Sequence, residues 1–264
     1  MIIMRQRNAA AERTDARRKF SGYKRDACSP LRDLKHKNGT LGKLVETWLH
    51  LVEDSDPHCN LEAMDEATSS AAKNLICSPE DIREFSAVLK HFEHFPPISG
   101  DDHDPECISG YFLSALINQS PAQNFTVIAD TDSFDILRLG YRNTKNIIIE
   151  GDSTYELGFS MKSGMIMVRH FTRELVGCEV EGGIIITQNV SGPIAEGMQG
   201  GLLIINGDVD LSPYPSNLHG MRHGIGEGME GGEIHIYGDI IGEADFSKVR
   251  GGKIYQRGKL LNLK

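Results

Sequence analysis

The stretch that decides the fold is present twice, as EGMQGGLLIINGD at 196–208 and as EGMEGGEIHIYGD at 227–239. In both copies a glycine pair precedes a short apolar run, and Gly-Asp follows the run. Similar runs recur from residue 140 onward, where 23 of the 28 glycines lie. The residue pairs that precede successive runs are offset by 18, 19, 18, 31 and 20 positions. These pairs are Lys145-Asn146, Ser163-Gly164, Gly182-Gly183, Gly200-Gly201, Gly231-Gly232 and Gly251-Gly252.

A second column of the repeat is apolar and lies two residues before each of the last five pairs. A short period with a recurring apolar position is typical of a solenoid, because one unit is too small to bury its own apolar side. Short β-branched runs with glycine turns favour a parallel β-helix over a helical solenoid. The long interval predicts an insertion at 209–225. The apolar column consists of Met161, Val180, Met198, Met229 and Val249.

The glycine pairs have two alternative explanations, a phosphate-binding loop and a tight corner of the coil. The run from Gly224 to Gly228, GIGEG, contains part of a dinucleotide-binding fingerprint, which needs a strand before it and a helix after it. A further glycine pair and a strand follow this run instead. A corner that lies ~4.8 Å from the next coil, or that takes a positive φ angle, favours glycine without any ligand. We therefore expect each pair to mark a corner.

Three regions of the chain differ in composition and charge. Residues 1–39 hold 11 Lys and Arg against 4 Asp and Glu and few large apolar residues, which predicts a disordered basic tail. Residues 40–120 hold 4 basic and 15 acidic residues and show helical apolar spacing. Residues 121–264 form the expected right-handed parallel β-helix of five to six coils. Within the helical segment, helices are expected at 40–54, 78–95 and 108–120.

The two ends of a solenoid need protection, because an open coil exposes strand edges and an apolar cross-section. The expected helix at 108–120 lies directly upstream of the first coil, so we expect it to cap that end. At the other end, the basic residues of GKIYQRGKLLNLK at 252–264 are expected to discourage the stacking of copies.

The repeats GCEVEGGIIIT, AEGMQGGLLIINGD and GEGMEGGEIHIYGD together resemble the GXGXG repeat domain. That domain forms the C-terminal right-handed β-helix of the large subunit of glutamate synthase and the C subunit of formylmethanofuran dehydrogenase. The resemblance covers about 140–258 and implies a β-helix that serves as a scaffold, with the chemistry on other domains or subunits. The chain shows no N-terminal nucleophilic cysteine, flavin barrel or iron–sulfur cysteine cluster of glutamate synthase, so the resemblance implies a stand-alone relative.

Histidines near the end of the second expected helix are a candidate metal site. His91 and His94 lie about one helical turn apart, and His103 follows within an acidic loop. These are ligand types for a divalent metal, although the spacing matches no established motif and also fits a solvated polar face.

The predicted insertion is a candidate binding loop, because it carries Tyr214, His219, Arg222 and His223. A histidine pair with an arginine could bind an anion or act in acid–base chemistry. The alternative is a tolerated surface loop, since each doubling of loop length costs only ~0.6 kcal/mol.

The sequence favours a non-catalytic scaffold or protein-interaction module, because it shows a solenoid and no catalytic constellation. The alternatives are a β-helix subunit of an oxidoreductase or amidotransferase complex, and a small metal- or anion-dependent enzyme that uses the insertion. No cofactor is expected. The expected partners are protein chains, with redox or amidotransferase subunits and a homo-oligomer as alternatives, and nucleic acid is expected at most at the basic tail. Five scattered cysteines and no membrane-length apolar run predict a cytoplasmic protein.

Overall fold

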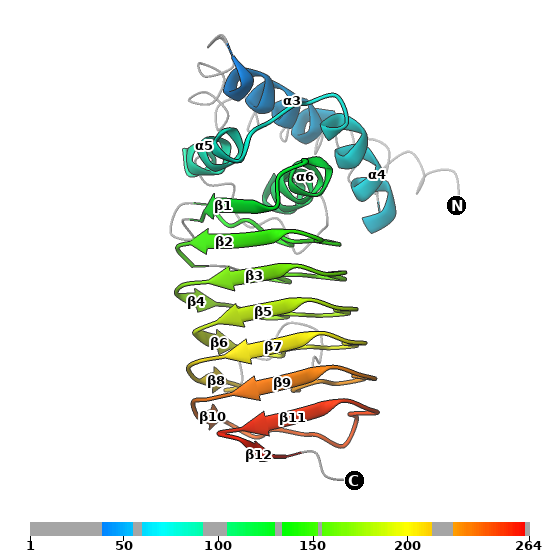
Figure 1. Ribbon diagram of the computed structural model, residues 1–264, viewed down its shortest axis with the longest axis vertical. Helices are drawn as coiled ribbons and strands as arrows, with labels where there is room; N and C mark the ends of the chain where they lie inside the picture. The colour runs from blue at the N-terminus through cyan, green and yellow to red at the C-terminus, as the bar shows by residue number, and fades with distance from the viewer. Residues whose placement is uncertain are drawn as a thin grey trace, which may run out of the picture.

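The computed structural model shows a parallel β-solenoid of about six turns that follows four described helices (Figure 1). The expected fold class, a parallel β-helix with a small helical segment before it, is confirmed. Of the expected basic tail, only Gly39 belongs to the part of the chain that the structure describes. The described residues are 39–54, 60–91, 105–129, 134–152, 155–212 and 224–261.

The largest side of the solenoid is an eight-stranded sheet, here called sheet A. Neighbouring strands pair in parallel, except for the last two, which form an antiparallel pair. In order, sheet A consists of β1 (Asn124–Ile128), β2 (Asn146–Glu150), β3 (Met165–Val168), β5 (Ile184–Thr187), β7 (Leu202–Ile205), β9 (Glu233–Ile236), β11 (Lys253–Gln256) and β12 (Lys259–Leu260).

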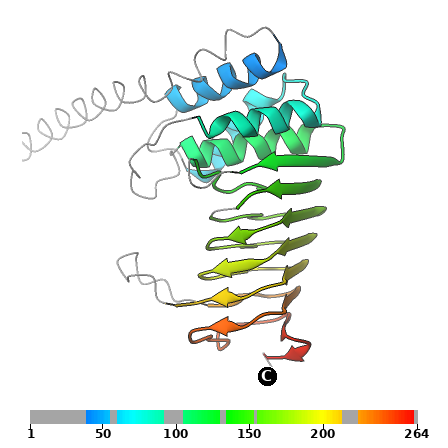
Figure 2. The same ribbon diagram turned by 90° about the vertical axis from the view of Figure 1, so that its left-hand side faces the viewer.

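Two further sides close each coil, and Figures 1 and 2 show the resulting stack from two directions. A four-stranded parallel sheet forms the second side. Single bridges that join Val176 to Ile194 and Ile194 to Ile225 mark the third side. The second sheet consists of β4 (Phe171–Thr172), β6 (Asn189–Ser191), β8 (Val209–Asp210) and β10 (Ile240–Ile241).

The interior of the solenoid is a continuous apolar stack. Every second residue of a strand points inward, so residues in register on successive strands of sheet A lie above one another. The residues of the apolar repeat column are at most 2 % exposed. The inward stack of sheet A is also at most 1 % exposed and consists of Ile147, Ile166, Ile185, Leu203, Ile234 and Ile254.

The glycine pairs lie where one coil passes closest to the one before it. A Cβ atom on Gly200 would lie 2.4 Å from the carbonyl oxygen of Glu181 in the preceding coil. Gly201 has a φ angle of +82°, and a Cβ atom there would lie 2.8 Å from the carbonyl oxygen of Gly183. Because Cβ and oxygen atoms do not pack that closely, the stacking of coils itself requires glycine at this corner.

The corner before β2 is one residue shorter than the later corners, so β2 and β3 lie 19 residues apart and not the 18 of the sequence alignment. Asn146 pairs with Met165, so the interval to the next strand is 19 residues, and Lys145 rather than Asn146 occupies the position of Gly164. The physical reason is Asn143, which takes the place of the apolar column residue and is 1 % exposed. Its side-chain amide donates to the carbonyl oxygen of Lys145 (2.7 Å) and accepts from the N–H group of Lys145 (3.2 Å), which closes a tighter corner.

The insertion is shorter than the expected 209–225. At its start, β8 pairs with β6 and β10, and Leu211 is 2 % exposed. At its end, Gly224 and Ile225 form bridges to neighbouring coils. The regular coil therefore continues to residue 211 and resumes at 224, and positions 213–223 lie outside the described residues.

The helices gather at the β1 end of the solenoid (Figure 1). The expected helix at 78–95 ends at Leu89, and the helix expected at 108–120 begins at Pro105. One helix, α4, was not expected, because only Met64, Thr68 and Ala72 of its twelve residues are buried. The four helices are α3 (Thr40–Asp54), α4 (Leu61–Ala72), α5 (Pro79–Leu89) and α6 (Pro105–Gln119).

Side chains of α5 and α6 satisfy backbone groups of the first coil. The Ser86 hydroxyl oxygen accepts a hydrogen bond from the N–H group of Ile128 in β1 (2.9 Å). The Ser114 hydroxyl oxygen accepts from the N–H groups of Gly140 (2.9 Å) and Tyr141 (3.2 Å). Both helices therefore act together where the sequence predicted one capping helix, and each satisfies backbone groups at the open end.

A hairpin covers part of the other end of the solenoid. β12 turns back to pair with the end of β11, and the N–H group of Leu261 donates to the carbonyl oxygen of Ile254 (2.8 Å). This short antiparallel strand covers part of the last parallel edge of sheet A.

Candidate functional site

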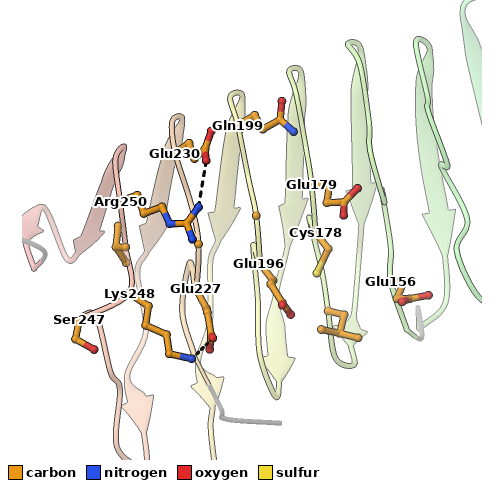
Figure 3. Close-up of a pocket in the computed structure, with 14 residues that line it drawn as sticks. Glu156, Cys178, Glu179, Glu196, Gln199, Glu227, Glu230, Ser247, Lys248 and Arg250 are labelled. Atoms are coloured by element: carbon orange, nitrogen blue, oxygen red, sulfur yellow. Dashed lines mark hydrogen bonds and ion pairs between the residues drawn. The ribbon is translucent and has the colours of Figure 1, made fainter.

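A hollow of about 890 Å³ runs along the third side of the solenoid, between Glu156 and Arg250 (Figure 3). Gly197 and Gly228 form part of its lining, and the N–H group of Gly197 donates to the carbonyl oxygen of Glu227 (2.8 Å) in the following coil. Since neither glycine carries a side chain, the surface is hollowed where these two coils meet.

The charges of this hollow belong to pairs that join successive coils. Lys248 forms an ion pair with Glu227, and Arg250 lies 3.5 Å from Glu230 (Figure 3). Such surface pairs contribute at most ~1 kcal/mol each. The hollow therefore combines carboxylates along most of its length with two cations at its C-terminal end.

Cys178 lines the hollow but is a poor nucleophile. The residue is 5 % exposed, and burial raises the pKa of its thiol well above the usual range. The thiolate is the reactive form of cysteine, so a buried thiol with a raised pKa holds very little of the reactive form at neutral pH and is shielded from reagents. Like Cys178, Cys77 and Cys107 are free thiols.

The GIGEG run forms a corner of a coil, and its amides are used between coils. The N–H group of Gly226 donates to Ile194 in the preceding coil (2.9 Å), and that of Gly228 donates to Lys248 in the following coil (3.1 Å). A phosphate-binding loop needs N–H groups that point together at the ligand. These two N–H groups point in opposite directions along the solenoid, which argues against a phosphate cradle.

The histidine and loop candidates from the sequence are only partly described. His91 is exposed and follows the end of α5, whereas His94 and His103 lie outside the described residues. Within the described ranges, no group of three or more His, Cys, Asp and Glu side chains could hold a metal ion. All four loop candidates, Tyr214, His219, Arg222 and His223, lie outside the described residues.

The outward surface of sheet A is apolar in the middle, and the sequence analysis missed it. We call the following seven residues of β2, β3, β5 and β7 the apolar face. They lie at the strand positions that are not buried, and Ile184 is 37 % exposed. None of them belongs to the core or to the partly buried residues packed against it. They are Ile148, Met165, Met167, Ile184, Ile186, Leu202 and Ile204.

A sequence signal for this face was available. A half-buried strand alternates apolar and polar residues, whereas a strand that is apolar at every position is typical of burial on both sides. The runs IIIT at 184–187 and LLII at 202–205 have no such alternation. Their continuous apolar character indicates that both sides of these strands are buried. The interior of the solenoid buries one side, and the outward surface of sheet A is the other.

Polar groups border the apolar face on β9 and β11. Glu233 lies 3.0 Å from His235 and accepts a hydrogen bond from Lys253 (3.2 Å). The pKa of the Glu233 carboxyl group is lowered, mainly by its hydrogen bond with His235 and to a lesser extent by its hydrogen bond with Lys253. The hydrogen bond with Glu233 in turn raises the pKa of Lys253. The ring of Tyr255 lies 4.7 Å from that of His235. All four side chains therefore form one polar and aromatic cluster at this border.

A groove of about 180 Å³ borders the apolar face at the β1 end. The first turn of α5, with Glu80 and Arg83, forms one wall, and Thr126, Ile148 and Met165 of sheet A form the other. Arg83 also lies 3.5 Å from Glu150 of β2. The turn of α5 therefore stands over the outward surface of the sheet.

Among the helices that the structure describes, none combines the length and hydropathy of a membrane-crossing segment. Comparison of the chain with known protein families, with curated proteins and with solved structures found no match. The resemblance to the GXGXG repeat domain therefore stays a prediction from the sequence.

Proposed function

We propose that the protein is a non-catalytic scaffold that binds another protein chain through the outward surface of sheet A. The observation that carries this proposal is the apolar face, which is formed by adjacent strands of a rigid stack. Apolar patches larger than a few hundred Å² mark protein–protein contacts, and this face lies at the lower limit of that size.

The size of the face indicates what a partner must contact. Four strands at ~4.8 Å spacing and four residues at ~3.3 Å give a flat area of ~250 Å². Burial of that area contributes ~6 kcal/mol, which is near the lower end of the cost of association. A partner must therefore also contact the polar residues that border the face at both ends.

A subunit role in an oxidoreductase or amidotransferase complex is the second candidate. It rests on the resemblance of the repeats at 140–258 to the GXGXG domain, and it would use the same rigid scaffold. Affinity purification from native cells, with metal and flavin analysis of the eluate, separates the two. Stoichiometric cofactor-bearing subunits in the eluate support the complex, and a cofactor-free eluate supports the simple scaffold.

Site-specific photo-crosslinking in the native cells tests the proposal. A photoreactive amino acid at position 186, in the centre of the apolar face, should give a crosslinked product with one defined protein. The same amino acid at Gln199, which is exposed on the third side, is the matched control. Equal crosslinking at both positions, or none at position 186, would show that sheet A is not the binding surface.

A further inference from the structure

We propose that the apolar face binds a second copy of this chain, with the two solenoids head to tail about a twofold axis that passes over β5. This inference rests on the proposed function, because it names the occupant of the same surface. The argument comes from the order of side chains across sheet A.

The outward side chains of sheet A form two rows that run across the strands in register. The first row is polar on two strands, apolar on three and polar again on two. From β1 to β11 it reads Asn124, Asn146, Met165, Ile184, Leu202, Glu233 and Lys253. The second row reads Thr126, Ile148, Met167, Ile186, Ile204, His235 and Tyr255.

The first row has the same polarity in either direction, which is what a self-complementary interface needs. In a twofold contact, residue i of one copy meets residue j of the other, and j meets i. Reversal about β5 places Met165 against Leu202 of the second copy and Ile184 against its own counterpart. It places the charged residues of β9 and β11 against amides, with Asn146 opposite Glu233 and Asn124 opposite Lys253. In this row apolar groups therefore meet apolar groups and no like charges meet, whereas in the second row Ile148 meets His235.

The second row gives the contact a shape match at both ends. The groove under α5 lies beside Thr126 and Ile148 at one end of the face. Tyr255, stacked on His235, lies at the other end. Head-to-tail reversal brings Tyr255 of the second copy opposite Thr126, next to this groove. Each dimer contains this contact twice.

The alternative twofold arrangement, with coil against coil, is disfavoured by α5. The first turn of this helix stands on the same side of sheet A as the apolar face. Two copies aligned coil against coil would bring both α5 helices to the same place between sheets that pack ~10 Å apart, which is the diameter of one helix. In the head-to-tail arrangement each helix instead meets the end of the other solenoid.

The area of contact predicts a weak and reversible dimer. Seven strands at ~4.8 Å spacing and four residues at ~3.3 Å give ~440 Å² of flat sheet per copy. Specific interfaces of average size bury ~800 Å² per partner, so this contact lies at the low end. Dimer formation should therefore depend on protein concentration.

Sedimentation of the full chain over a concentration series up to ~10⁻⁴ M tests the dimer, since this range covers weak interfaces. We expect the mass to rise from 29.2 kDa toward twice that value. Ile186→Lys should lower the association constant at least ~100-fold, because two lysines would meet at the axis. Gln199→Lys makes a similar change on the third side and should leave association unchanged. Circular dichroism melting curves establish that both variants fold, and Met167→Lys serves if Ile186→Lys does not fold.

Crosslinking between introduced cysteines tests the orientation. Because facing sheets lie ~10 Å apart and a direct disulfide needs a Cα–Cα distance below ~7 Å, a thiol-specific reagent that spans ~10 Å replaces direct oxidation. With this reagent a mixture of Asn124→Cys and Lys253→Cys proteins should form crosslinked heterodimers, and neither variant alone should crosslink with itself above the level of the parent chain. Self-crosslinking of Lys253→Cys would show the coil-against-coil arrangement and would overturn the proposed orientation.

The outcomes distinguish this inference from the proposed function. A chain that stays monomeric while position 186 crosslinks to a different protein would overturn the inference and leave the proposed function standing. A monomer with no crosslink at position 186 would overturn both. A dimer that Ile186→Lys and Gln199→Lys weaken equally would also refute the use of this face.

Discussion

The substitution Gly201→Ala tests whether the glycine pairs exist because of coil stacking. Gly201 has a φ angle of +82°, and an added Cβ atom would lie 2.8 Å from the carbonyl oxygen of Gly183. The left-handed backbone costs a residue with a Cβ atom ~1–2 kcal/mol, and overpacking costs a further ~1–3 kcal/mol. We therefore expect Gly201→Ala to lower the free energy of unfolding by ~2–5 kcal/mol.

Two matched variants separate these contributions. Gly258 has nearly the same φ angle, +78°, but no atom lies within 4 Å of an added Cβ, so Gly258→Ala should lose only the ~1–2 kcal/mol of backbone strain. At Gly182 an added Cβ would lie 2.6 Å from the carbonyl oxygen of Lys162, and its backbone is not left-handed. Gly182→Ala should therefore lose only the ~1–3 kcal/mol of overpacking.

Thermal unfolding followed by circular dichroism measures all three. At ~2–4 °C per kcal/mol for a chain of this size, Gly201→Ala should lower Tm by ~4–20 °C and Gly258→Ala by ~2–8 °C. If Gly201→Ala and Gly258→Ala lower Tm equally, the neighbouring coil does not require glycine and the stacking argument is wrong.

The remaining predictions concern the cap, the hollow and the helical segment. Ser114→Ala removes the acceptor of the Gly140 and Tyr141 N–H groups, so it should destabilise the chain by ~1–3 kcal/mol and accelerate hydrogen exchange at both amides; unchanged exchange would contradict the cap. Burial raises the pKa of Cys178, so at about pH 8 its thiolate fraction is small and iodoacetamide should label it only after unfolding, as peptide mapping would show; labelling of the folded chain would contradict this. The fragment 121–264 should aggregate in light scattering, because the edge of β1 is exposed; a soluble monomer would refute that.

The solenoid could be predicted from the sequence because each coil repeats the same steric demand. A glycine pair marks the corner in four of the six repeats, and a Met or Val precedes it by two residues, so both columns can be recognised in the sequence. The first coil was misaligned by one residue because Asn143 replaces the apolar residue of the column there. Its hydrogen bonds to Lys145 shorten the corner, and a pattern built on apolar residues cannot show that.

The helical segment was less predictable, because its boundaries depend on tertiary contacts. Helix α4 buries Met64, Thr68 and Ala72 along one face, but Met64 is the only large apolar side chain among them, so the apolar spacing is weak in the sequence. Its contacts with the solenoid include the ion pair between Asp65 and Arg142 (2.7 Å). In contrast, α5 begins at a local signal, since Ser78 and Asp81 form a capping box. A capping box can be recognised in the sequence because its residues are three positions apart, whereas an ion pair between distant residues cannot.

The apolar face was missed for a reason that also shows how to find it. In IIIT and LLII both alternate positions are apolar, so these strands alone do not reveal which side faces outward. The bordering strands resolve this, because Asn146 on β2 and Glu233 on β9 mark the outward position by their polarity. Parallel register carries that assignment to Met165, Ile184 and Leu202 between them. The same polar residues that identify the outward row also give it the same order of polar and apolar side chains from either end. A twofold contact needs this symmetry, so it favours a second copy of the chain over an unrelated partner.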